Sequence, residues 1–125
     1  MAKNKTDNPV YFIGAGPGDP ELLTVKGKRL LEQADVVIYA GSLINPEMLK
    51  FCSRKAEQID SAPLCLDYIA KVMIDRAKRG QRVVRMHSGD PSVHSTIGEQ
   101  MKMHSEAGID CEVVPGGSYL GATGW

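Results

Sequence analysis

Two short strand patterns rich in apolar residues, each leading into a glycine-rich loop, constrain the fold of this 125-residue chain more than any other feature. The run 10–13 leads into the loop 14–20, the run 82–86 leads into the loop 87–92, and each loop contains the triplet Gly-Asp-Pro. Short apolar runs bounded by glycine are typical of parallel strands that are buried on both faces. In open α/β sheets, ligands bind to the loops that follow the carboxyl ends of such strands.

Strand and helix patterns alternate along the rest of the chain. The strands are expected over residues 10–13, 36–39, 58–60, 82–86 and 111–114, and the helices over residues 24–34, 46–51, 66–78 and 97–107. Thr24 can cap the first helix, and Gly80 and Gly108 suit the positions just past two helix ends. This order predicts an α/β fold with a five-stranded, mainly parallel sheet flanked by helices, and with both glycine-rich loops at one edge of the sheet.

Charge and hydropathy exclude several classes of protein. Fifteen basic residues balance fifteen acidic ones, and the basic residues are scattered, so no nucleic-acid partner is expected. Residues 1–9 are polar and expected to be disordered, they lack the apolar stretch of a signal peptide, and no later stretch approaches a membrane span. These observations predict a soluble cytoplasmic protein with no membrane partner.

Neither the cysteines nor the histidines have the spacing of a metal site. The three cysteines form no Cys-x-x-Cys pair, and their odd number favours reduced thiols over a disulfide framework. His87, His94 and His104 are separated by seven and ten residues, so no two of them stand one helical turn apart. We therefore expect no bound metal.

The first loop resembles the dinucleotide-binding fingerprint but departs from it. Asp19 stands where the fingerprint has its last glycine, and Pro17 lies inside the loop. A carboxylate at that position would repel a pyrophosphate. The acidic residue expected at the end of the second strand is also missing, because Asp35 begins that strand. A nicotinamide-dependent oxidoreductase is therefore disfavoured, and a simple tight turn is the alternative.

The second loop, Gly89-Asp90-Pro91, can also be interpreted in two ways. All three residue types are common in turns, so the loop can be purely structural. In the functional interpretation, a ligand approaches the backbone closely and meets the carboxylate of Asp90. Such a site suits a ligand with an amine or another positive centre. S-adenosylmethionine has an α-ammonium and a sulfonium and carries no phosphate.

Four segments of the chain, in order, resemble the tetrapyrrole methyltransferase family of cobalamin and sirohaem biosynthesis. They are residues 11–24 (YFIGAGPGDPELLT), 34–43 (ADVVIYAGSL), 61–64 (SAPL) and 87–92 (HSGDPS). The last three are most similar to the branch of precorrin-4 and cobalt-precorrin-4 C11-methyltransferases. The resemblance covers about residues 10–116 of the chain.

The resemblance implies an architecture and an activity. Members have two α/β domains, bind S-adenosylmethionine in the cleft between them, methylate a macrocycle carbon and commonly form homodimers. Residues 10–116 then form the N-terminal domain, residues 117–125 are an atypical glycine-rich tail, and the second domain is absent. The implied reaction is C-methylation of precorrin-4 or cobalt-precorrin-4 at C11, with the isolated chain inactive. The alternative is a non-catalytic fragment or assembly domain that keeps the fold.

The resemblance also implies site residues. By family position, the cofactor contacts Pro17, Ser88, Gly89, Asp90, Val93, Ser118 and Tyr119. His87 and His94 are candidates for the substrate side of the cleft, and local packing is the alternative role for both. Some relatives carry an acidic base after the second strand, where this chain has Ala40 and Gly41, so no catalytic base is assigned.

Overall fold

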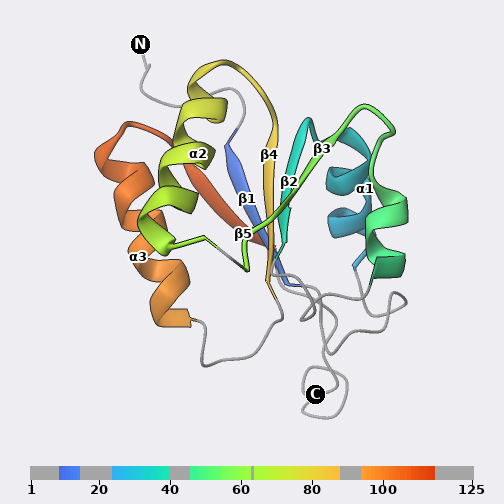
Figure 1. Cartoon of the computed structure of the whole chain (residues 1–125), viewed down its shortest axis with the longest axis horizontal. Helices are drawn as coiled ribbons and strands as arrows, with labels where there is room; N and C mark the ends of the chain where they lie inside the picture. The colour runs from blue at the N-terminus through green and yellow to red at the C-terminus, as the bar shows by residue number, and fades with distance from the viewer. Residues whose placement is uncertain (1–8, 15–23, 40–45, 63, 88–93, 115–125) are drawn as a thin grey trace.

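Helices cover both faces of a parallel sheet in the computed structural model of the chain (Figure 1). The structure describes residues 9–14, 24–39, 46–62, 64–87 and 94–114, and for Pro46 and residues 94–97 it describes the backbone only. In chain order, the elements are β1 (Val10–Gly14), α1 (Val25–Gln33), β2 (Val36–Tyr39), η4 (Pro46–Phe51), β3 (Glu57–Asp60), α2 (Leu66–Lys78), β4 (Val83–His87), α3 (His94–Glu106) and β5 (Cys111–Val114).

The five described strands form one sheet in the order β3-β2-β4-β1-β5, and every neighbouring pair is parallel. The central strand β4 pairs with β2 on one side and with β1 on the other. The predicted five-stranded, mainly parallel sheet is therefore confirmed. Each strand lies within one residue of its predicted bounds, and β4 is shifted by one residue, to 83–87.

The helix boundaries agree with the sequence at most ends. The Thr24 hydroxyl accepts a hydrogen bond from the backbone N–H of Gly27 at 3.0 Å, so the predicted cap of α1 is confirmed. Helix α2 has its predicted bounds, and Gly80 follows it with a φ of +85°, a conformation that favours glycine. Within the described ranges, no helix is long and apolar enough to cross a membrane.

Two helices differ from the prediction. Helix α3 begins at His94, three residues before the predicted start at Ile97. The polar sequence His-Ser-Thr in its first turn is compatible with a helix, because first-turn amides need no acceptor within the helix. The segment Pro46–Phe51 is helical as predicted, but it has 3₁₀ geometry, which short helices often adopt.

The sheet has a separate hydrophobic core on each face. Helices α1 and η4 cover one face, and α2 and α3 cover the other (Figure 1). The core under α1 and η4, here called the α1 layer, contains Ile13, Leu31, Ala34, Val37, Met48, Val84, Met86 and Val114. The opposite core, the α2–α3 layer, contains Val10, Phe12, Val36, Ile38, Ile69, Met73, Ala77, Val83 and Ile109. Successive side chains of a strand point to opposite faces, so each central strand contributes to both layers.

Candidate functional site

The carboxyl ends of β1 and β4 lie next to each other. Gly14, the last residue of β1, is paired with His87, the last residue of β4. The two Gly-Asp-Pro segments continue from these residues, so the strand ends that lead into them meet at one edge of the sheet, as predicted. The predicted cofactor contacts themselves lie outside the described residues: Pro17, Ser88, Gly89, Asp90, Val93, Ser118 and Tyr119.

The helices that follow these two strands in the chain lie on opposite faces of the sheet. After β1 the next helix is α1, on one face, and after β4 the next helix is α3, on the other (Figure 1). Adjacent parallel strands whose connections separate in this way create a crevice at the carboxyl edge of the sheet. Ligands of open α/β proteins bind at such topological switch points. The β1–β4 edge is therefore the candidate site.

The two predicted substrate-side histidines flank the segment 88–93. His87 ends β4 and is half-buried, and its place in the strand puts it on the same face as Val83, toward the α2–α3 layer. His94 is the first residue of α3, and its side chain lies outside the described part. The backbone therefore places both histidines at the ends of the candidate loop.

Arg85 is a buried charged residue that the sequence analysis treated only as part of a strand. It lies on β4, 8% exposed, and faces the α2–α3 layer. Its Nη1 donates a hydrogen bond to the Ser61 hydroxyl at 2.8 Å. Burial lowers the pKa of Arg85 from its ordinary value, because the charged guanidinium is removed from water. Its place in a central parallel strand, covered on both faces, could have predicted this burial.

Ser61 extends the contact from Arg85 to a third strand. The Ser61 hydroxyl donates to the carbonyl oxygen of Tyr39 at 3.0 Å, and the Ser61 backbone N–H donates to the same oxygen at 2.7 Å. Tyr39 ends β2 and Ser61 directly follows β3. Arg85 and Ser61 thus connect the carboxyl ends of β2, β3 and β4.

A second buried polar pair lies on α3. His104 is fully buried, and its Nδ1 lies 2.6 Å from the carbonyl oxygen of Gln100. Because that partner only accepts, Nδ1 carries the proton, and burial lowers the pKa of His104. The His104 ring packs edge-to-face on Phe12, with centroids 5.9 Å apart. Gln100 is 1% exposed, and its side-chain amide has no hydrogen-bond partner in the described part of the chain.

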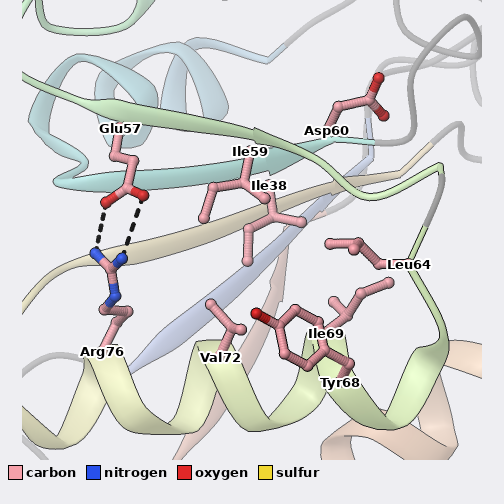
Figure 2. Close-up of a pocket in the computed structure, with 9 residues that line it drawn as sticks. All are labelled: Ile38, Glu57, Ile59, Asp60, Leu64, Tyr68, Ile69, Val72 and Arg76. Carbon is pink, nitrogen blue, oxygen red and sulfur yellow. Dashed lines mark hydrogen bonds and ion pairs between the residues drawn. The ribbon is translucent and has the colours of Figure 1, made fainter.

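A cavity of about 390 Å³ lies between β3 and α2 (Figure 2). Its lining residues are Ile38, Glu57, Ile59, Asp60, Leu64, Tyr68, Ile69, Val72 and Arg76. Arg76 donates two hydrogen bonds to the Glu57 carboxylate across one end, at 2.6 and 3.2 Å, and this interaction raises the pKa of Arg76. The cavity is mostly apolar, and none of the predicted site residues lines it. The β1–β4 edge is therefore a better candidate for the functional site than this cavity.

Two of the three thiols are unsuited to nucleophilic chemistry. Cys52, Cys65 and Cys111 are free. Burial raises the pKa of Cys52 and of Cys111 to about 11, so both thiols remain protonated near neutral pH. Among the residues whose placement is described, no group of three or more histidine, cysteine or acidic side chains is arranged to hold a metal ion.

Comparison with known families gives a match over most of the chain. The family model described as "Tetrapyrrole (Corrin/Porphyrin) Methylases" matches residues 9–123. A cobalt-precorrin-4 C(11)-methyltransferase from Methanocaldococcus jannaschii is 50% identical over 111 residues, which are 89% of this chain and 43% of the relative. A precorrin-4 C(11)-methyltransferase from Pseudomonas aeruginosa is 49% identical over 107 residues, 86% of this chain and 42% of that protein.

Solved structures show the same similarity in three dimensions. The X-ray structure of a cobalt precorrin-4 methyltransferase, a cobalamin biosynthetic enzyme, has a TM-score of 0.83 and 44% identity, over 95% of this chain and 48% of that chain. A uroporphyrin-III C-methyl transferase from Thermus thermophilus, complexed with S-adenosylhomocysteine, has a TM-score of 0.74 and 37% identity, over 94% of this chain and 48% of that one. The chain thus spans less than half the length of these relatives.

Proposed function

The chain belongs to the family of tetrapyrrole (corrin/porphyrin) methylases, and from this membership we propose that it forms the cofactor-binding half of a corrin-precursor C-methyltransferase. The proposed reaction is transfer of a methyl group from S-adenosylmethionine to C11 of precorrin-4 or cobalt-precorrin-4. The names of the relatives from Methanocaldococcus jannaschii and Pseudomonas aeruginosa support this substrate class. The single structural observation that supports a ligand site is the pairing of Gly14 with His87 at a topological switch point.

The residues at this edge fit S-adenosylmethionine better than a nucleotide phosphate. The segments that continue from Gly14 and His87 carry the carboxylates of Asp19 and Asp90. Carboxylates repel phosphate and attract an ammonium group. The relative solved with S-adenosylhomocysteine, the demethylated form of this cofactor, supports the same choice.

In the proposed mechanism, the protein chiefly positions its ligands. S-adenosylmethionine, when bound, supplies an activated methyl group on its sulfonium. Asp90 binds the cofactor's α-ammonium, and the glycines of the segments after β1 and β4 let the ligand approach the backbone. Holding two reactants in line can contribute ~7–11 kcal/mol to lowering a barrier. No residue of this chain is assigned as a catalytic base, in keeping with Ala40 and Gly41 in the segment after β2.

The proposal includes a second domain and a partner copy. We propose that residues 10–116 are the N-terminal domain, and that a second α/β domain closes the cofactor cleft in the active protein. The share of the relatives left uncovered, more than half of each, supports this arrangement. We further propose a cytoplasmic homodimer that acts on a tetrapyrrole substrate. Sedimentation of the protein with both domains tests the dimer.

Cofactor binding is the first test. In a full-length version with both domains, we expect isothermal calorimetry to detect binding of S-adenosylmethionine and S-adenosylhomocysteine, and we expect Asp90→Ala to weaken it by about 1–3 kcal/mol, the usual cost of losing a charged hydrogen-bond partner. Asp67→Ala is the matched control, because Asp67 is exposed on α2. Equal affinities for the wild type and a folded Asp90→Ala variant would reduce Asp90 to a turn residue.

Turnover separates the enzyme from a non-catalytic fragment. We expect the 125-residue chain to bind the cofactor weakly and to transfer no methyl group, because an open cleft admits water and weakens polar contacts. Fusion to the uncovered part of the Methanocaldococcus jannaschii relative should restore methylation of a precorrin-4 acceptor. A fusion that binds the cofactor yet never methylates would favour the assembly-domain alternative. A dye-displacement assay with NAD tests the oxidoreductase alternative.

A further inference from the structure

The burial of Arg85 requires an explanation beyond packing. The side chain is 8% exposed and lies between Val83 and His87 on the face of β4 that packs against the α2–α3 layer. Removal of a guanidinium from water is costly unless a carboxylate or several acceptors compensate. In the part of the chain that the structure describes, its hydrogen-bond partner is the neutral hydroxyl of Ser61, at 2.8 Å. Such a residue stabilises the fold less than an apolar side chain of the same size.

The contacts of Arg85 join three strands at the edge that carries the candidate site. Ile38 on β2 is paired with Arg85 on β4. The Arg85 side chain therefore crosses β2 to reach Ser61, which follows β3 in the order β3-β2-β4. Ser61 is 4% exposed and donates to the Tyr39 carbonyl oxygen through both its hydroxyl and its backbone N–H. The hydrogen bonds thus extend the pairing of β2 and β3 one residue beyond the end of β3.

The chain continues from these strand ends into the segments that matter for the site. Residues 40–45 follow Tyr39, the last residue of β2. Residues 88–93 follow His87, the last residue of β4, which stands two positions after Arg85. A shift of the strand ends would therefore change where both segments start. Misplacement of a site by about 1 Å can cost roughly 100-fold in rate.

We propose that Arg85 and Ser61 form a positioning pair, which fixes the carboxyl ends of β2, β3 and β4 relative to one another and so positions His87, the residue from which the proposed cofactor-binding segment continues. The inference rests on the proposed function for the identity of the cofactor. Neither residue needs to touch the cofactor. The ligand is the same as in the proposed function. The inference adds two residues that position the ligand site.

The first measurement compares affinity with stability in the 125-residue chain. We expect Arg85→Met and Ser61→Ala each to weaken binding of S-adenosylhomocysteine about tenfold, the effect of losing one charge-assisted hydrogen bond. The melting temperature should not fall for Arg85→Met, because replacing a buried charge by an apolar side chain is commonly neutral or stabilising. Ser61→Thr, which keeps the hydroxyl, should restore wild-type affinity.

Two control variants make the same types of substitution at exposed residues outside the pair. Arg79→Met removes an exposed arginine that caps the C-terminus of α2, and Ser105→Ala removes an exposed hydroxyl of α3. Both should leave affinity unchanged. Wild-type affinity in Arg85→Met and Ser61→Ala would overturn the proposal, and so would an affinity loss that only follows a fall in melting temperature or that Ser61→Thr fails to rescue.

A ligand-free measurement keeps the pair testable if the cofactor is wrongly identified. Amide hydrogen exchange over residues 87–93 should become about tenfold faster in Ser61→Ala than in Ser105→Ala, because the start of the segment is no longer held. Equal exchange in the two variants would overturn the positioning role. Faster exchange in Ser61→Ala, combined with a wild-type chain that never binds S-adenosylhomocysteine, would leave the pair standing and reject the proposed function.

Discussion

The two faces of the sheet are built differently. The buried cluster of the α1 layer combines aliphatic and methionine side chains from four strands, α1 and η4. Every buried polar side chain among the described residues belongs to the opposite, α2–α3 layer: Ser61, Arg85, Gln100 and His104. Both layers exclude water from the same strands, yet only one of them carries groups that are costly to bury.

This difference suggests that the α1 layer chiefly stabilises the fold, whereas the α2–α3 layer gives up part of its stability to polar groups near the candidate site. An apolar layer gains from every buried methylene group, at about 0.8 kcal/mol each. A layer that buries a guanidinium and an amide loses part of this gain. Such local violations of good packing are expected where a protein positions a functional site. The Arg85–Ser61 contact lies at the carboxyl edge, where the candidate site is, and so matches this expectation.

The largest effect should come from the α1 layer. Ile13→Ala should lower the free energy of unfolding by about 2–5 kcal/mol, because Ile13 is fully buried and the variant leaves a cavity. Urea unfolding followed by circular dichroism measures this change. Val113→Ala is the control, since Val113 on the edge strand β5 is 47% exposed, and it should cost far less. A similar cost for both variants would show that the α1 layer is not tightly packed.

Much of the fold could be predicted from the sequence, because periodicity and glycine placement report it directly. Helix α2 repeats apolar residues at helical spacing, and its bounds agree with the prediction at both ends. The run 36–39 is apolar throughout and became β2 with no change of bounds. Topology followed from alternation of strands and helices, since a parallel sheet needs crossover helices. The start of α3 was missed because its first turn, His94-Ser95-Thr96, contains no apolar residue.

The candidate site could be predicted only in part. The pairing of the two strand ends followed from their order in the chain. The Arg85–Ser61 contact did not, because it joins residues 24 positions apart on strands whose lateral order the sequence does not state. Gln100 and His104 stand four residues apart, so they share a helix face. From the sequence, polar residues at that spacing indicate an exposed helix face. In the structure both side chains are buried, and the His104 ring packs on Phe12.

The next prediction tests whether the polar residues of the α2–α3 layer are costly. Gln100→Met should raise the free energy of unfolding by about 1–3 kcal/mol, because it removes a buried amide without a hydrogen-bond partner among the described residues. Methionine keeps a similar length and flexibility. Urea unfolding compares it with Glu99→Met, a control at an exposed neighbour on α3. A loss of stability would mean that the Gln100 amide has a favourable role in the folded chain.

A smaller effect concerns His104 and pH. Its folded-state pKa is lowered by burial below the ordinary value of 6.5, so its stabilising contribution is complete above that pH. Below pH 6.5 the unfolded chain takes up a proton that the folded chain does not, and stability should fall by up to about 1.4 kcal/mol per pH unit. His104→Leu should remove this part of the slope. Parallel pH dependence of wild type and variant would show that His104 titrates equally in both states.

The smallest effect should come from the ion pair of Arg76 and Glu57 at the rim of the cavity in Figure 2. Its two hydrogen bonds join α2 to the edge strand β3, but Glu57 is half exposed, so solvent screens the attraction. A double-mutant cycle of Arg76→Met and Glu57→Gln should give a coupling free energy below about 1 kcal/mol, and it should decrease further at high salt. The Arg79–Asp75 pair, exposed on α2, is the matched control. Arg85 instead donates a buried hydrogen bond to the neutral hydroxyl of Ser61, and its replacement by methionine should change ligand affinity. A coupling of several kcal/mol at the rim would erase this contrast between exposed and buried polar contacts of the α2–α3 layer.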